Sequence, residues 1–245
     1  TGVGKSLFMC HVASSVISEG KNVLYITLEM AEERIAERID ANLLDVTIDD
    51  LYEMPKEIYD NKTSKMQNKT NGQLIIKEYP TASAHAGHFK SLLDELALKK
   101  AFKPDLIFID YLNICTSSRF KGGNINSYTM VKSIAEELRG LAVQYNVPIV
   151  SATQTTRTGY LSSDVGLEDT SESFGLPATA DFMFALISND ELEELGQIKV
   201  KQLKNRYNDP AVNRAFIIGV DRSKMRLYDV EQSAQQIVDS NQESK

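Results

Sequence analysis

The sequence contains no tryptophan and few cysteines or histidines. Its 245 residues include 2 Cys and 3 His. Cys10 and Cys115 lie in apolar surroundings without a companion at metal-ligand spacing, so we interpret both as reduced core residues. His11, His85 and His88 form no ligand set with cysteines or carboxylates. A metal site built from protein side chains alone is therefore not expected.

Long apolar runs and an excess of positive charge are also absent. No stretch of about 18 uncharged apolar residues occurs, which argues against a membrane-spanning helix and a membrane partner. The chain carries 27 Lys and Arg against 34 Asp and Glu, a formal net charge of -7. This balance argues against coating nucleic acid through a globally basic surface, but it leaves room for local basic loops. The length suits one globular domain.

One glycine is missing from an otherwise familiar pattern at the start of the chain. Residues 1–6 read TGVGKS, so the first glycine of GxxxxGK[ST] would fall before residue 1. In such a loop, Gly2 and Gly4 allow backbone N–H groups to surround phosphates, Lys5 reaches the terminal phosphates, and Ser6 places its hydroxyl on Mg²⁺. A chance Gly-Lys-Ser turn before a helix is the alternative. Motifs elsewhere in the chain are needed to distinguish a phosphate-binding loop from such a chance turn.

Helical and strand patterns alternate along most of the sequence. Apolar residues from Leu7 to Ile17 recur at helical spacing, and VLYITL at 23–28 is typical of a buried parallel strand. Further helices are expected at 31–44, 88–100 and from Ser127 onward, an exposed connection at 61–72, and strands at 74–79, 106–110, 147–152, 182–187, 198–203, 214–220 and 225–230. This order predicts a three-layer α/β fold, with a mainly parallel sheet and antiparallel strands at its C-terminal edge.

Three polar residues end predicted strands. Asp110 closes LIFID, where nucleotide hydrolases place a carboxylate for Mg²⁺. Glu29 closes VLYITL and could polarise an attacking water, or it could cap the next helix. Gln154 follows VPIVSA and could sense the γ-phosphate, or it could be a solvated loop residue. Because ligands bind beyond the carboxyl ends of parallel strands, these groups and GKS can converge on one crevice.

The succession of short motifs resembles a known family. GVGKS, TLEM (27–30), LIFIDYL (106–112), SATQ (151–154), ATAD (178–181) and KNR (204–206) together resemble the RecA-type motor domain of DnaB-family hexameric replicative helicases. The resemblance covers essentially the whole chain and is closest to the branch found in T-even-like tailed phages. It implies a RecA-like P-loop NTPase core that spans 1–245. It also implies that an N-terminal domain, a linker and a first strand precede Thr1, and a tail from about 232 is expected to be disordered or helical.

The resemblance assigns roles to individual residues. Gly4, Lys5 and Ser6 would bind phosphate, Ser6 and Asp110 would coordinate Mg²⁺, and Glu29 would be the catalytic base. Gln154 resembles the γ-phosphate sensor. Arg206, with Lys204 two residues earlier, resembles the arginine finger that reaches the nucleotide of a neighbouring subunit; a solvated charge pair in a turn is the alternative. These roles are carried over position by position.

Single-stranded DNA would pass through the centre of a homohexameric ring. The family's pore loops correspond to 117–124, which contains Arg119 and Lys121, and to the acidic segment 157–175, where contact would come from backbone N–H groups, Arg157 and Ser173. Six copies of a small basic loop are compatible with a net charge of -7.

The function expected from the sequence is that of an ATP-dependent replicative DNA helicase motor, with ATP and Mg²⁺ as cofactors. Single-stranded DNA, a primase and a helicase loader are the expected partners, and the cytoplasm, of a host cell if the gene is a phage gene, is the expected location. A RecA-like recombinase or remodelling ATPase shares Lys5, Asp110 and Glu29. A non-catalytic nucleotide-binding assembly module is the alternative from another class, against which Glu29, Gln154 and Arg206 argue.

Overall fold

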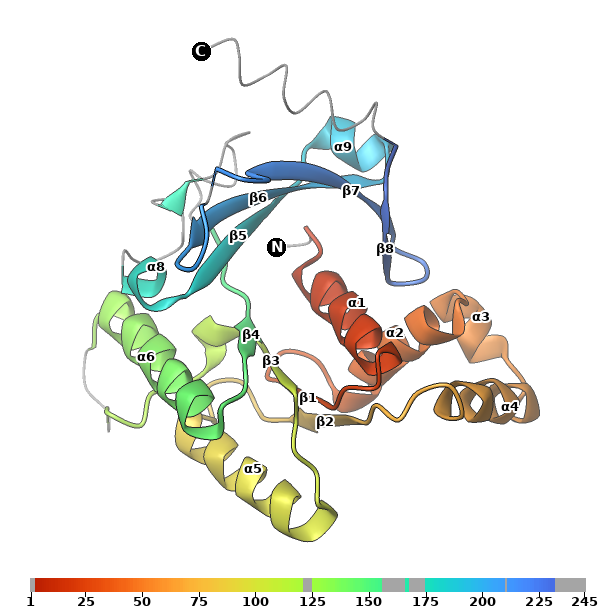
Figure 1. Ribbon diagram of the computed structural model, residues 1–245, viewed down its shortest axis with the longest axis horizontal. Helices are drawn as coiled ribbons and strands as arrows, with labels where there is room; N and C mark the ends of the chain where they lie inside the picture. The colour runs from red at the N-terminus through yellow and green to blue at the C-terminus, as the bar shows by residue number, and fades with distance from the viewer. Residues whose placement is uncertain (1–2, 121–124, 156–165, 168–174, 210, 232–245) are drawn as a thin grey trace.

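The computed structural model describes residues 3–120, 125–155, 166–167, 175–209 and 211–231 (Figure 1). Helices and strands alternate through the first half of the chain and strands dominate the second. The helices are α1 (Lys5–Ser18), α2 (Glu32–Leu44), α3 (Ile48–Glu53), α4 (Lys56–Gln67), α5 (Ala86–Lys100), α6 (Ser127–Tyr145), α8 (Gly175–Thr179), α9 (Asp190–Glu194) and the 3-10 turn η1 (Leu112–Ile114). The strands are β1 (Val23–Thr27), β2 (Leu74–Glu78), β3 (Leu106–Asp110), β4 (Ile149–Ser151), β5 (Phe182–Ile187), β6 (Gln197–Asn205), β7 (Ala215–Asp221) and β8 (Arg226–Asp229).

A parallel sheet forms the centre of the molecule. Its strand order is β2-β1-β3-β4, with β1 paired to both β2 and β3. All five residues of β1 are buried, because helices cover both faces of the sheet. The pairing Thr27 with Asp110 aligns the ends of β1 and β3, and Ile109 with Ser151 aligns β3 with β4. The carboxyl ends of three neighbouring strands therefore lie at one edge.

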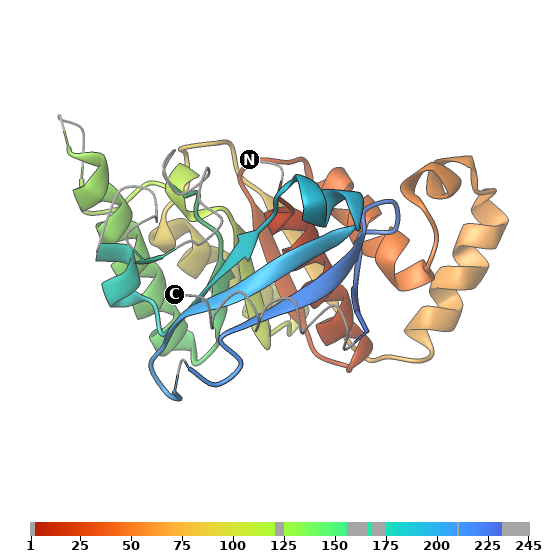
Figure 2. The same cartoon turned by 90° about the horizontal axis from the view of Figure 1, so that it is seen from above.

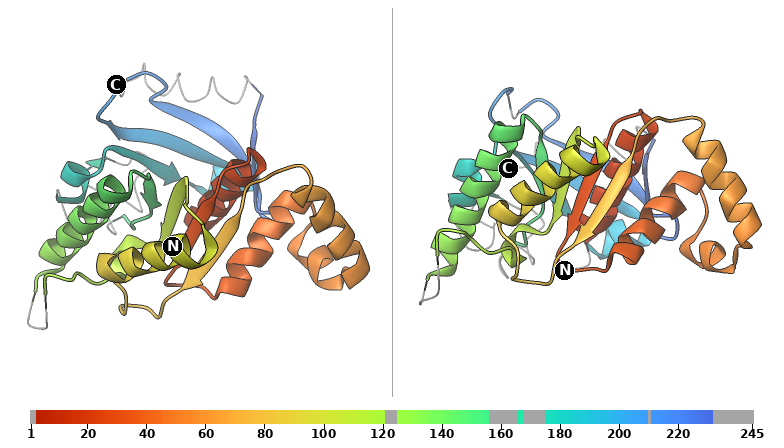
Figure 3. Two further views of the ribbon diagram at one scale, coloured as in Figure 1. Left: turned by 60° about the horizontal axis from the view of Figure 1, so that its bottom comes forward. Right: turned by 90° about the horizontal axis from the view of Figure 1, so that it is seen from below.

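Alternate residues of the parallel sheet pack into two separate cores. Leu24 and Ile26 of β1 face α5 and α6, whereas Val23 and Tyr25 face α1 and α2, because successive side chains of a strand point to opposite faces. Figure 3 shows α5 and α6 on one face of the sheet and α1 and α2 on the other. The helices contribute Phe89, Leu93, Leu96, Ile134 and Leu138 on one side, and Met9, Cys10, Ala13, Ile35 and Ile39 on the other.

The antiparallel strands form a sheet of their own. Their order is β5-β6-β7-β8, and within the part of the chain that the structure describes they pair only with one another. Figure 2 shows these strands crossing over α1. Leu7 of α1 packs against Ile198 and Val220 of this sheet, while the opposite side of α1 faces the parallel sheet. The fold belongs to the expected α/β class. Helix α1 lies between the two sheets and packs on both of them.

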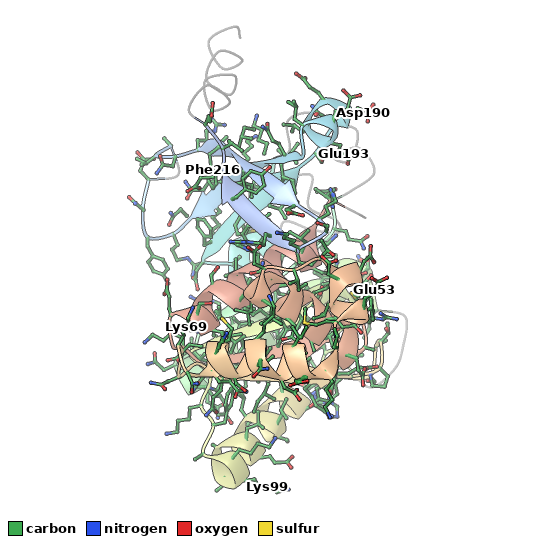
Figure 4. All side chains as sticks on the ribbon, turned by 90° about the vertical axis from the view of Figure 1, so that its right-hand side faces the viewer. Glu53, Lys69, Lys99, Asp190, Glu193 and Phe216 are labelled. Atoms are coloured by element: carbon green, nitrogen blue, oxygen red, sulfur yellow. The ribbon has the colours of Figure 1, made fainter. Side chains whose placement is uncertain are left out.

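The segment 61–72 corrects one expectation from the sequence. It was expected as an exposed connection, but its first seven residues belong to α4. No residue of α4 is buried, and the Tyr59 hydroxyl donates to Asp40 Oδ2 of α2 at 2.7 Å. Figure 4 shows α4 as an outer layer, with Glu53 and Lys69 near its two ends. A helix that is polar on all sides has no apolar periodicity, so its sequence looked like a loop.

Polar contacts hold the β7–β8 hairpin against α1 and α2. Asp45, directly after α2, accepts from Lys224 Nζ at 3.1 Å and from Arg226 Nη1 at 2.7 Å. The His11 ring of α1 accepts at Nδ1 from the Leu227 amide at 3.3 Å. These contacts fix the orientation of the antiparallel sheet relative to α1 and α2. In the described residues no helix is long and apolar enough to cross a membrane.

The His11 contact predicts a specific pH dependence of stability. Burial and the nearby Arg226 charge lower the pKa of His11 below its ordinary 6.5, so the unfolded chain takes up a proton at higher pH than the folded chain. The contribution of His11 is complete above about pH 6.5 and is lost as the pH falls through the lowered folded pKa. In His11→Gln, thermal unfolding followed from pH 5 to 8 should depend less on pH than in the wild type. Identical pH dependence would contradict this role.

Candidate nucleotide site

The first turn of α1 carries three of the predicted phosphate-binding residues. Gly4 is the N-cap residue with φ 113° and ψ 26°, and Lys5 and Ser6 are the first two helical residues. A Cβ at Gly4 would meet Ile198 Cδ1 at 3.5 Å, which is ordinary contact, so the left-handed backbone rather than space requires glycine here. This places free backbone N–H groups and the positive end of the helix dipole beside Lys5. Gly2 lies outside the described residues.

The sheet brings Glu29 and Asp110 to the same edge. The Leu28 amide donates to the Asp110 carbonyl oxygen at 2.8 Å, which continues the β1–β3 pairing past the end of β1. The Thr27 hydroxyl donates to the Met30 carbonyl oxygen at 2.7 Å and accepts from the Met30 amide at 3.1 Å, so it closes a turn around Glu29. The side chain of Glu29 is exposed at this turn, and α2 begins only after the N-cap Ala31. Glu29 is thus free to face a ligand.

Asp110 is almost completely buried, and its two carboxylate oxygens have different surroundings. It is 1% exposed, and Oδ2 accepts from the Tyr25 hydroxyl at 3.0 Å. Oδ1 has no hydrogen-bond partner among the residues that the structure describes. Burial, and then the electrostatic influence of Cys10 and Asp110, raises the pKa of Tyr25 well above 10. Its phenol therefore stays protonated and can donate a hydrogen bond. A buried carboxylate oxygen without a donor costs free energy unless a ligand supplies a partner.

Gln154 is connected to the same edge through a second tyrosine. Its Nε2 donates to the Tyr111 hydroxyl at 3.1 Å, and Tyr111 directly follows Asp110. Burial, and then the negative charges of Glu29 and Asp110, raise the pKa of Tyr111. The aligned ends of β1, β3 and β4 therefore bring Glu29, Asp110 and Gln154 to one edge of the sheet. Tyr25 and Tyr111 were not predicted from the sequence. The available signal for Tyr25 was its place two residues before Thr27, which puts its side chain on the same face of the sheet as Asp110.

Arg206 and Lys204 gather around a different carboxylate. Arg206 Nη1 donates to Asp181 Oδ1 at 2.6 Å, and Arg139 Nη2 of α6 donates to the same oxygen at 2.9 Å. Arg206 Nη2 and Lys204 Nζ also reach the Ala178 carbonyl oxygen at the end of α8, at 3.1 and 3.4 Å. Burial opposes ionisation of Asp181, but the hydrogen bond and charge of Arg139 outweigh it and lower the Asp181 pKa. Both predicted finger residues are therefore held in place by the end of α8 and by Asp181.

The start of the first predicted DNA loop is anchored to α6. Glu137 accepts from the Ser117 hydroxyl, and from the Ser118 amide and hydroxyl at 3.1 and 3.0 Å. Arg119 Nη1 pairs with Glu136, and its Nε lies 3.9 Å from Glu137. The predicted DNA contact Arg119 is therefore held by two carboxylates of α6. The other predicted DNA contacts, Lys121, Arg157 and Ser173, lie outside the described residues.

Comparison with known families identifies the class of protein. The model of the DnaB-like helicase C-terminal domain matches residues 1–238, so the chain belongs to this family. It is 47% identical over 235 residues to the DnaB-like replicative helicase of Enterobacteria phage T4, a match that covers 95% of this chain and 50% of that protein. It is 23% identical over 189 residues to the replicative DNA helicase DnaB of Helicobacter pylori, covering 75% and 37%. The chain spans about half the length of the phage relative.

Solved structures share the fold at lower sequence identity. A DnaB-like replicative helicase, described with its interactions with primase, superposes with a TM-score of 0.75 at 17% identity, covering 94% of this chain and 55% of that one. A second solved structure, described as an ATPase domain, gives a TM-score of 0.76 at 16% identity, covering 94% and 82%. The expected RecA-like fold and the family resemblance are confirmed.

The Glu137 contacts predict that this residue orders the start of the loop. Glu137→Ala removes three hydrogen bonds to a carboxylate, and bonds to charged groups contribute about 1.5–3 kcal/mol. We expect hydrogen exchange in the peptide containing 117–119 to accelerate by about tenfold or more, since about 1.4 kcal/mol corresponds to a factor of ten. Glu136→Ala, which removes only ion pairs with Arg119 and Lys132, is the matched control. Equal exchange in the two variants would contradict the assignment.

Proposed function

We propose that this chain is the ATP-hydrolysing motor of a replicative DNA helicase. The observation that carries the proposal is the convergence of Glu29, Asp110 and Gln154 at one edge of the parallel sheet, on the ends of β1, β3 and β4. Family membership and 47% identity to a phage replicative helicase support the same activity. Lys5 and Ser6, at the start of the helix packed on this sheet, supply the phosphate-binding groups.

The donor set fits Mg²⁺ held with a nucleoside triphosphate. Mg²⁺ prefers oxygen ligands and keeps several of its waters, so one or two protein oxygens suffice. The Asp110 Oδ1 atom is a buried carboxylate oxygen without a donor among the described residues, and Ser6 places a hydroxyl in the first turn of α1. When bound, the ion would neutralise charge that develops on the phosphates. Lys5 and the amides that follow Gly4 would bind the phosphate oxygens.

Hydrolysis would use the exposed Glu29 and the half-buried Gln154 at the same edge. Glu29 would accept the proton of the water that attacks the γ-phosphate, a role that requires a carboxylate within hydrogen-bond reach of this water. Gln154 would respond to the γ-phosphate through its amide. Its Nε2 donates a hydrogen bond to the Tyr111 hydroxyl, and Tyr111 directly follows Asp110 in the chain. In the sequence, Gln154 lies between the end of β4 and the predicted second DNA loop at 157–175.

Arg206 would complete the site of a neighbouring subunit in a homohexamer. A guanidinium supplied in trans stabilises charge on the transferring phosphoryl group. Arg206 and Lys204 are grouped at the end of β6, where Asp181 and the α8 carbonyl oxygens hold them. This arrangement supports a pre-positioned finger more than a solvated charge pair in a turn.

Single-stranded DNA, a primase and a loader are the partners we propose. Arg119 and Lys121 would follow the DNA backbone within the ring, together with Arg157, Ser173 and backbone N–H groups of 157–175. A net charge of -7 permits this, because the basic loops of six subunits gather in one pore. One structural relative is described with its interactions with primase, which supports a primase as partner. If a phage encodes the chain, it acts in the host cytoplasm.

Two other activities share parts of this site. A RecA-like recombinase or remodelling ATPase would use Lys5, Asp110 and Glu29 in the same way, and forked-DNA unwinding without strand exchange separates the helicase from it. A non-catalytic assembly module would bind nucleotide but would not turn it over. The combination of Glu29, Gln154 and Arg206 favours turnover.

Removal of the proposed base should separate nucleotide binding from hydrolysis. In the full-length protein we expect Glu29→Gln to bind ATP normally and to lose DNA-stimulated hydrolysis by about 10²- to 10⁴-fold, the usual effect of a general base. Lys5→Ala should lose both, because its ammonium group contacts the phosphates. Arg34→Ala, an exposed arginine paired with Glu37, is the control. Wild-type turnover in Glu29→Gln, or no DNA-stimulated turnover in the wild type, would rule out the proposal.

Mixed hexamers test the trans role of Arg206. Arg206→Ala alone should lose hydrolysis by about 10³- to 10⁵-fold, the range for arginine fingers. Mixing Arg206→Ala with Lys5→Ala subunits should restore part of the ATPase rate, because some interfaces then pair an intact phosphate loop with an intact finger. Inactive mixtures, measured over a series of subunit ratios in the full-length protein, would show that Arg206 does not act across the interface.

A further inference from the structure

The environment of the Asp110 carboxylate is asymmetric. Oδ2 accepts a hydrogen bond from the Tyr25 hydroxyl at 3.0 Å, and Oδ1 has no partner among the residues described. Asp110 as a whole is 1% exposed, so water does not substitute freely for the missing donor. One oxygen is satisfied by the protein, and the other is buried without a donor among the described residues.

Tyr25 is held rigidly in this position. It is 0% exposed in the centre of β1 and pairs in register with Phe108 of β3. The two rings stack with centroids 5.5 Å apart and planes 24° from parallel. Asp110 lies two residues beyond Phe108 and on the same face of β3, so the ring of Tyr25 points its hydroxyl at the carboxylate. Because the ring is buried and held by stacking and strand pairing, its hydroxyl stays directed at the Asp110 carboxylate.

Tyr25 also connects the carboxylate to the phosphate-loop helix. Cys10 of α1 is 0% exposed and packs in the same core as Tyr25. Cys10 lies one helical turn beyond Ser6. The phenol therefore lies between the helix that carries the phosphate-binding residues and the strand that carries Asp110.

We propose that Tyr25 is a positioning residue for the metal-binding carboxylate. By donating to Oδ2, it fixes the rotation of the Asp110 carboxylate and presents Oδ1 alone toward the nucleotide site. Mg²⁺ demands near-ideal octahedral geometry and is held by single carboxylate oxygens, so a carboxylate held by a hydrogen bond at its other oxygen suits it. The inference rests on the proposed Mg²⁺-nucleotide role of Asp110, and it adds a residue to which the sequence pattern assigned no role.

Tyr25→Phe in the full-length protein tests the inference without using catalysis as the readout. Phenylalanine keeps the ring and its stacking on Phe108 and removes only the hydroxyl. Binding of the fluorescent nucleotide mant-ADP is titrated at increasing Mg²⁺. We expect the Mg²⁺ concentration for half-maximal binding to rise by about 10-fold, within the 10- to 100-fold range for loss of a group that orients a metal ligand. Binding of mant-ADP in EDTA should stay at the wild-type level.

Tyr59→Phe is the matched control, because it also removes a tyrosine–aspartate hydrogen bond, to Asp40 in the α2–α4 region. It should leave the Mg²⁺ requirement unchanged. A wild-type Mg²⁺ requirement in folded Tyr25→Phe, or an equal rise in both variants, overturns the inference. If Tyr25→Phe does not fold, 3,5-difluorotyrosine introduced at position 25 keeps the ring and changes the hydroxyl's donor strength. It must shift the Mg²⁺ requirement, and an unchanged requirement overturns the inference.

Asp110→Asn separates failure of this inference from failure of the proposed function. If Asp110→Asn leaves the Mg²⁺ dependence of mant-ADP binding unchanged, Asp110 does not hold the metal and the proposed function loses its metal site. If Asp110→Asn changes the Mg²⁺ dependence of mant-ADP binding and Tyr25→Phe leaves it at the wild-type level, only the role of Tyr25 is wrong. In the Asp110→Asn background, Tyr25→Phe should cause no further change in the Mg²⁺ requirement, since its effect passes through Asp110.

Discussion

The parallel pairing of β1, β3 and β4 is the constraint on which the site depends. The register Thr27 with Asp110 and Ile109 with Ser151 ends three strands at one level. Because parallel strands present their carboxyl ends at the same edge, residues about 80 and 45 positions apart in the chain become neighbours. A slip of one residue in β3 would turn Asp110 to the opposite face, away from α1. Sheet register, more than any single side chain, therefore assembles the candidate nucleotide site.

The helix α1 connects this site to the rest of the molecule. Its first turn carries Lys5 and Ser6, one side packs on the parallel sheet through Met9 and Cys10, and Leu7 packs on the antiparallel sheet. His11 holds the β7–β8 hairpin to the same helix, and Asp45, directly after α2, holds the hairpin to α2. The helix that begins with Lys5 and Ser6 is thus in direct contact with both sheets.

The cations proposed to meet partners are paired within the chain. Arg119 pairs with Glu136 and Glu137, and Arg206 shares Asp181 with Arg139. These pairs are partly exposed, where ion pairs contribute little to stability and exchange partners readily. Phosphate groups of DNA or nucleotide would compete with these carboxylates. The pairs hold the cations in defined places in an acidic protein without neutralising them permanently.

The sequence by itself determined the alternation of helices and strands, the GKS turn, and the polar residues at the ends of β1, β3 and β4, because these are local patterns of spacing and side-chain type. The helix α4 was not predicted, because a helix without a buried face has no apolar periodicity in its sequence. Only the tertiary structure decided that Tyr25 satisfies one oxygen of Asp110, that Tyr111 accepts a hydrogen bond from Gln154, and that the C-terminal strands pair into their own sheet. Each of these depends on contacts between residues that are distant in the chain. A local sequence pattern does not specify which distant side chain or strand a residue contacts.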